Sequence, residues 1–180
     1  MPTFRVLVTV AALAFVGASP AVAQVDDRAW EECKRNPEPD WVVFNCTAVI
    51  EGAGDQSKSR RARALVLRSA AFVRKKDPEK ARSDLTRAVS LAPDNPEILT
   101  ARADFLFAQG ELEGAAEDYK LAIEHEPRHV RAHFGLAGIA RQRGDIQGAV
   151  AGLDKVLSID PRYPRARSLR AEWSKGASGS

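Results

Sequence analysis

One spacing recurs along most of this 180-residue chain and limits the folds that are open to it. Pro93, Pro127 and Pro161 lie 34 residues apart, and each follows an equivalent stretch. Further positions keep the same interval, namely Ala81, Ala115 and Ala149; Leu85, Tyr119 and Leu153; and Lys76, Gly110 and Gly144. A period of this length over about 100 residues predicts an array of repeated units, each packed against its neighbours.

Each period contains the signals of two helices. In the second period Asn95 is a predicted N-cap, Pro96 fits the first helical position and Gly110 is a predicted stop. Residues 111–125 then place apolar side chains three and four positions apart, which is the pattern of an amphipathic helix. We therefore predict an all-α chain, and the absence of a glycine-rich strand-to-helix turn argues against a Rossmann-type enzyme.

The pattern resembles the tetratricopeptide repeat family. The resemblance rests on the period, the proline that ends each repeat, the small residue early in each second helix, Tyr119 in an aromatic position, and Ala103 and Ala137 in the small position of the first helix. It implies an α-solenoid of three helix-turn-helix repeats over residues 62–163. The implied repeats are 62–95, 96–129 and 130–163.

The repeats depart from the family pattern at a few positions. The large position early in the first helix holds Leu65, Leu99 and His133 instead of tryptophan. Ser69 and Lys76 stand in the first repeat where a small residue and glycine are usual. These departures weaken the resemblance of the first repeat without breaking its period.

The segments on either side of the repeats resemble end caps. Residues 164–175 look like the family's C-terminal capping helix, followed by a flexible tail at 176–180, and residues 24–61 are predicted to form an N-terminal helical cap. Residues 45–52 bear a weaker resemblance to the N-terminal part of small exported bacterial repeat proteins. The resemblance as a whole therefore implies a small exported bacterial member of the family.

The first 23 residues have the composition of a secretory signal peptide. Arg5 precedes a run of thirteen mostly apolar residues, and an A-x-A site ends at Ala23. A retained anchor is the alternative, but thirteen helical residues span only about 20 Å of a hydrocarbon core about 30 Å thick. We expect cleavage after Ala23, no membrane span in the mature chain, and a periplasmic or secreted protein.

The two cysteines take their meaning from this predicted export. Cys33 and Cys46 lie in two short predicted helices joined by a proline-rich turn, and export would place them in an oxidising compartment. We predict a structural disulfide between them that staples the N-terminal cap. A redox or metal role is the alternative, although the chain has neither a C-x-x-C motif nor a matching ligand set.

The basic residues gather in one segment although the chain is nearly neutral, with 27 basic and 24 acidic residues. Residues 56–76 contain eight basic residues and no acidic one. Six of them are predicted to form a basic patch: Lys58, Arg60, Arg61, Arg68, Lys75 and Lys76. The segment is either a solvated helix face or an electropositive surface for an acidic partner, anionic lipid or an envelope polymer. Nucleic acid is not expected as a partner, because export would separate the protein from it.

The family resemblance also implies a concave groove, lined by the first helix of each repeat, that holds a peptide or a partner helix. Arginine and aromatic side chains are frequent anchors of such surfaces. The groove residues implied are Arg63, Val66, Ala70 and Arg74 from the first repeat, Glu97, Thr100, Asp104 and Phe107 from the second, and Arg131, Phe134, Gly138 and Arg141 from the third.

One subgroup of the family reads a C-terminal carboxylate with lysine, asparagine and arginine at fixed groove positions. The corresponding residues here are Val66, Ala70, Ala101, Arg131 and Gly135. Only Arg131 suits that chemistry, so we do not expect a cytosolic chaperone adaptor.

Nothing in the sequence predicts catalysis or a cofactor. The chain lacks a G-x-S-x-G, an H-E-x-x-H and a P-loop motif. His125, His129 and His133 are four residues apart, but Pro127 prevents one helix from presenting all three to a metal.

We therefore predict a non-catalytic protein-interaction module of the bacterial periplasm. The alternatives are an envelope-surface protein that binds anionic lipid or polymer through its basic helix, and an accessory subunit of an envelope enzyme or of cytochrome maturation.

Overall fold

The computed structural model describes residues 20–35, 37–52 and 57–177. These residues form nine α-helices and no strand, which confirms the all-α prediction. The helices are α1 (Pro20–Arg35), α2 (Pro39–Glu51), α3 (Lys58–Arg74), α4 (Pro78–Leu91), α5 (Pro96–Ala108), α6 (Leu112–His125), α7 (Val130–Gln142), α8 (Ile146–Ile159) and α9 (Pro164–Ala177). Residues 1–19 of the predicted signal peptide and residues 178–180 of the predicted tail lie outside the described residues.

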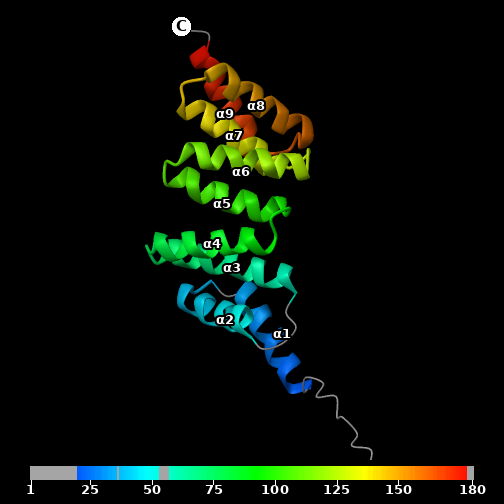
Figure 1. Ribbon diagram of the computed structural model, residues 1–180. Coiled ribbons are helices and arrows are strands. Elements are labelled where there is room, and N and C mark those ends of the chain that lie inside the picture. Colours follow the sequence, from blue (N-terminus) through cyan, green and yellow to red (C-terminus); the bar gives the residue numbers. More distant parts are fainter. Residues whose placement is uncertain (1–19, 36, 53–56, 178–180) are drawn as a thin grey trace, which may run out of the picture.

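The helices form an elongated stack that follows the order of the chain (Figure 1). Each helix packs against the next, and α3, α5 and α7 also contact one another in succession, as do α1 and α3. This arrangement is a solenoid of helix pairs, in which each pair relies on its neighbours to bury its apolar face. None of the helices within the described part of the chain is long and apolar enough to cross a membrane.

Local signals set most of the helix boundaries. Asp77, Asn95 and Asp145 accept hydrogen bonds from backbone N–H groups of α4, α5 and α8. Helices α5 and α9 begin at Pro96 and Pro164, where proline loses no hydrogen bond. The capping residue and the first-position proline thus start these helices at the positions expected from the sequence.

The first repeat begins earlier than its predicted boundary. Helix α3 starts at Lys58, within the segment assigned to the N-terminal cap. The Ser57 hydroxyl accepts a hydrogen bond from the Arg60 N–H at 3.2 Å and so caps the helix there.

Small residues let the two helices of each pair approach closely. Ala81, Ala115 and Ala149 are completely buried at equivalent positions of α4, α6 and α8. Leu85, Tyr119 and Leu153, four residues further on, are also buried. A larger side chain at the alanine positions would force the helices apart and cost about 1–3 kcal/mol.

A disulfide joins the first two helices, as predicted. Cys33 of α1 and Cys46 of α2 are bonded with an S–S distance of 2.06 Å, and both are buried. They pack with Ala29, Val42 and Val49 in a core cluster that continues into α3.

Candidate functional site

Three adjoining hollows lie along the row of helices formed by α1, α3, α5 and α7. Their volumes are about 300, 290 and 420 Å³. We name them, from the N-terminal end, the Trp30 pocket, the Ala70 pocket and the Phe134 pocket. Arg131 lines all three, so they form one continuous groove.

The Phe134 pocket has aromatic walls and lies against the start of the capping helix. The rings of Phe134 and Tyr163 are 5.3 Å apart, and the Arg165 guanidinium lies 5.5 Å from the Phe134 ring centre. Phe107 forms another wall, and it packs so close to Gly138 that an added Cβ there would lie 3.3 Å from the ring. The pocket can therefore receive an apolar side chain beside a cationic group.

A chain of polar contacts forms the floor of the Phe134 pocket. The Tyr119 hydroxyl donates to Asp104 Oδ1 at 2.5 Å, and Arg131 forms an ion pair with Asp104. Burial, together with the hydrogen bond to Asp104, raises the pKa of the Tyr119 phenol, which stays protonated as a donor. Gly135 leaves room for this ring, because a Cβ there would lie 2.2 Å from Tyr119 Cζ.

The lining of the Trp30 pocket is more apolar than that of the Phe134 pocket. Helix α1 contributes Trp30 and Lys34, and α3 and α5 contribute the rest of the walls together with Arg131 of α7. The lining residues from α3 are Arg63, Val66 and Leu67, and those from α5 and the turn before it are Asn95, Glu97, Ile98 and Ala101.

Most of the groove residues predicted from the sequence line these pockets. They are Arg63, Val66, Ala70, Glu97, Asp104, Phe107, Arg131, Phe134 and Gly138. The other three, Arg74, Thr100 and Arg141, do not. Thr100 is completely buried, Arg74 donates to the Pro37 carbonyl, and Arg141 lies over the Trp173 ring.

The groove also contains residues that sequence reasoning missed. Trp30, Lys34, Tyr163 and Arg165 lie outside the predicted groove positions because they belong to the segments assigned as end caps or to the turn before α9. The signal that the sequence offered was an aromatic and a basic residue one helical turn apart, Trp30 and Lys34. The sequence alone did not connect these residues with α3 and α7.

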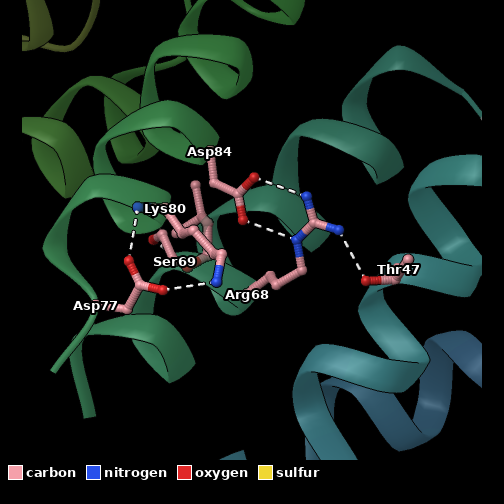
Figure 2. Close-up of polar contacts among 7 residues, drawn as sticks. Thr47, Arg68, Ser69, Asp77, Lys80 and Asp84 are labelled. Atoms are coloured by element: carbon pink, nitrogen blue, oxygen red, sulfur yellow. Dashed lines mark hydrogen bonds and ion pairs between the residues drawn. The ribbon is translucent and has the colours of Figure 1, made fainter. Parts of the chain in front are cut away.

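The basic patch contains one residue that does not belong on a surface. The prediction that Arg68 is part of an exposed patch is wrong, because only 8% of this residue is accessible. Its guanidinium makes two hydrogen bonds to Asp84, at 2.8 and 2.7 Å, and a third to the Thr47 hydroxyl at 2.7 Å (Figure 2). Arg68 thereby joins α2, α3 and α4.

Acidic residues from neighbouring helices compensate other charges of the patch. Arg60 pairs with Asp27 of α1 at 2.9 Å, and Lys75 pairs with Asp40 of α2. Residues 56–76 contain no acidic residue, but in the folded protein acidic side chains of α1 and α2 lie beside α3. The surface around α3 is therefore less positive than the sequence of this segment suggests.

The three histidines each contact a different partner. His125 lies 3.7 Å from Asp94, His129 lies 3.0 Å from Glu126, and His133 Nε2 lies 3.0 Å from the Pro127 carbonyl. Within the described ranges no group of three or more His, Cys, Asp or Glu side chains is arranged to hold a metal ion.

Protein-family models match most of the repeat region of this chain. Two models, both described as tetratricopeptide repeat, match residues 66–125 and 106–172. Together they span residues 66–172, which include most of α3 and all of the helices from α4 to α8.

Curated relatives share the repeats at moderate identity. A TPR repeat-containing thioredoxin from Arabidopsis thaliana is 38% identical over 35% of this chain and 9% of its own length. A heat-shock protein cognate co-chaperone from Aspergillus fumigatus is 38% identical over 50% of this chain and 26% of its own length. A TPR repeat-containing protein from Rhizobium etli is 26% identical over 86% of this chain and 74% of its own length. The chain thus spans only a small part of the first two of these relatives.

Solved structures of similar fold support the same architecture. A MamA RS-1 variant has a TM-score of 0.71 at 12% identity, covering 88% of this chain and 86% of its own. The first TPR of Spaghetti bound to an HSP90 peptide has a TM-score of 0.63 at 19% identity, covering 67% and 98%. The Sgt2 TPR domain from Aspergillus fumigatus has a TM-score of 0.62 at 26% identity, covering 69% and 85%.

Proposed function

Because the chain belongs to the tetratricopeptide repeat family, we propose that it is a non-catalytic interaction module that binds a segment of a partner protein in its groove. The observation that carries the proposal is the continuous groove, in which aromatic and arginine side chains from successive helices meet around Arg131. The similar Spaghetti structure holds an HSP90 peptide, and the Aspergillus relative is a co-chaperone.

We further propose that the module works in the bacterial periplasm. The supporting observations are the signal-peptide composition of residues 1–23 and the Cys33–Cys46 disulfide, since disulfides persist in oxidising compartments. N-terminal sequencing of the protein recovered from a periplasmic fraction tests this directly. We expect the mature chain to begin at Gln24, and recovery from the cytosol with residues 1–23 intact would contradict it.

A pull-down from periplasmic extract tests the groove. The double substitution Phe107→Ala with Phe134→Ala removes two aromatic walls of the Phe134 pocket, so we expect it to abolish capture of partners that the native protein retains. Phe44→Ala is the matched control, because Phe44 is exposed and lies on α2 away from the groove. Capture that survives the double substitution would overturn the groove model.

A further inference from the structure

The packing of the N-terminal cap carries an inference about the partner, and it rests on the proposed function. We propose that α1 and α2 form a fourth, sequence-divergent repeat, and that its Trp30 and Lys34 extend the groove into a site for an apolar side chain of an acidic partner segment.

Helices α2 and α4 bury the same positions when they are aligned on their first prolines, Pro39 and Pro78. The residues concerned are Val42, Asn45, Cys46 and Val49 in α2 and Ala81, Asp84, Leu85 and Ala88 in α4. Equivalence at four buried positions is the burial pattern of a second repeat helix. The interval between the two prolines is 39 residues and not 34, mainly because α3 has 17 residues where α5 has 13, and also because the connection between α2 and α3 is longer than the one between α4 and α5.

The disulfide occupies the place of an apolar contact between the two helices of a repeat. In this alignment Cys33 corresponds to Phe72 and Cys46 to Leu85, and Phe72 and Leu85 share a core cluster. The covalent bond therefore replaces the apolar contact that joins α3 to α4.

Helix α1 also takes the position of a first repeat helix. It contacts α3, just as α3 contacts α5 and α5 contacts α7. The row of helices that lines the groove thus begins at α1, and Figure 1 shows α1 and α2 at the lower end of the same stack. Trp30 and Lys34 reach the groove for this reason, whereas a simple end cap would only cover the apolar face of α3.

The chemistry of the Trp30 pocket indicates what it can bind. Its volume of about 300 Å³ is at the lower end for ligand pockets. Its apolar lining residues are Trp30, Val66, Leu67, Ile98 and Ala101. A single aliphatic or aromatic side chain is the apolar group that suits such a hollow.

The charges around the groove favour an acidic segment. Lys34, Arg63 and Arg131 surround the Trp30 pocket against one carboxylate, that of Glu97. Arg131 is paired with Asp104 and Lys34 with Glu31, but in the described part of the chain Arg63 has no acidic partner. Arg165, at the other end of the groove, adds a further positive charge. Carboxylates on either side of an apolar anchor would complement these charges.

Selection from a random peptide display library on the disulfide-bonded protein tests the proposal. We expect enriched peptides to contain an aliphatic or aromatic residue flanked by Asp or Glu. Enrichment of basic peptides, or of peptides without an apolar anchor, would overturn the proposal, and so would a failure to enrich any sequence.

The affinity of an enriched peptide is then compared among variants. We expect Trp30→Ala to weaken binding about tenfold or more, as is common for a buried tryptophan anchor. Because that substitution could also disturb the cap, Arg63→Glu serves as a second variant and is expected to weaken binding similarly at unchanged melting temperature. Lys58→Glu, on the same helix but outside the pockets, is the matched control and is expected to leave affinity unchanged.

The pattern of losses separates this proposal from the proposed function. Loss on Phe134→Ala with full affinity for both Trp30→Ala and Arg63→Glu would retain the groove and overturn the fourth repeat as part of the site. Full affinity in all three variants would overturn both.

Discussion

At the residue scale, one backbone conformation recurs where the first helix of each repeat ends. Gly110 and Gly144 have φ values of +80° and +81°, and Lys76, at the equivalent position of the first repeat, has +59°. Glycine adopts this left-handed conformation without steric cost, whereas a residue with a Cβ pays about 1–2 kcal/mol. The first repeat therefore carries strain that the other two avoid.

Lys76→Gly should relieve this strain. We expect the free energy of unfolding to rise by up to about 1 kcal/mol, less than the full strain because glycine also gains entropy in the unfolded chain. Urea denaturation measures the change. Gly110→Ala is the reverse substitution and serves as the control. Nothing lies within 4 Å of the added Cβ, so only the cost of the left-handed backbone conformation should lower the free energy of unfolding. A fall in stability for Lys76→Gly would contradict the interpretation.

Arginine–aspartate pairs between the two helices of a repeat recur at the same scale. Arg68 binds Asp84 in the first repeat, and Arg102, 34 residues later, binds Asp118 through two hydrogen bonds of 2.7 Å. The hydrogen bond to Asp118 raises the pKa of the Arg102 guanidinium. Such bidentate pairs fix the relative position of the two helices of a repeat, because both partners lose hydrogen bonds if the helices slide.

A double-mutant cycle on Arg68 and Asp84 measures this coupling. Removing either partner leaves a buried charge, so we expect Arg68→Ala and Asp84→Ala each to cost about 3–5 kcal/mol. The double variant should cost less than the sum of the two. Arg82→Ala is the control, because its exposed pair with Glu111 is expected to contribute less than about 1 kcal/mol. Additive losses at positions 68 and 84 would show that the pair is not coupled.

At the scale of the elements, the cap depends on a covalent bond where the repeats depend on apolar packing. Helices α1 and α2 follow each other in the chain, and the Cys33–Cys46 disulfide links them covalently. The bond removes conformations from the unfolded chain, and a loop of this size corresponds to about 3 kcal/mol.

Cys33→Ser combined with Cys46→Ser should reduce stability by about that amount. In a solenoid each unit contacts only its neighbours, so we expect the loss of amide hydrogen-exchange protection to concentrate in α1, α2 and α3. The amides of α7 and α8 serve as the internal control and should stay protected. A uniform loss across all helices would instead indicate that the chain unfolds as one unit.

At the scale of the whole molecule, α9 closes the far end of the solenoid. Ala166 is completely buried, and Leu169 and Trp173 pack against the cluster that contains Leu153 and Val156. Without α9 this apolar face of α7 and α8 would meet water or another molecule. Helix α9 thus completes the last repeat as well as one wall of the Phe134 pocket.

A chain that ends at Tyr163 tests this role. We expect it to melt at a lower temperature and to self-associate, because the exposed face is apolar. Circular dichroism follows the melting, and size-exclusion chromatography with light scattering follows the association. A chain that ends at Lys175 keeps the contacts of Leu169 and Trp173 and is expected to match the full protein. A monomeric, equally stable chain ending at Tyr163 would contradict the capping role.

Helix pairs, their turns and their period could be read from the amino-acid order, because caps, stop residues and apolar spacing act within a few positions. Asn95, Gly110 and the buried alanines are examples. The disulfide could be predicted because the chain has two cysteines and a single pairing within it.

The surroundings of the groove and of the basic segment depend instead on how the helices stack. Asp84 pairs with Arg68, Thr100 is buried in the core, and α1 brings Trp30 into a pocket that Arg131 also lines. These residues are far apart in the chain, and their distances follow from the rotation of each helix pair relative to the next. The apolar period specifies which face of a helix is buried, but the packing of whole pairs selects the residues that meet across the groove.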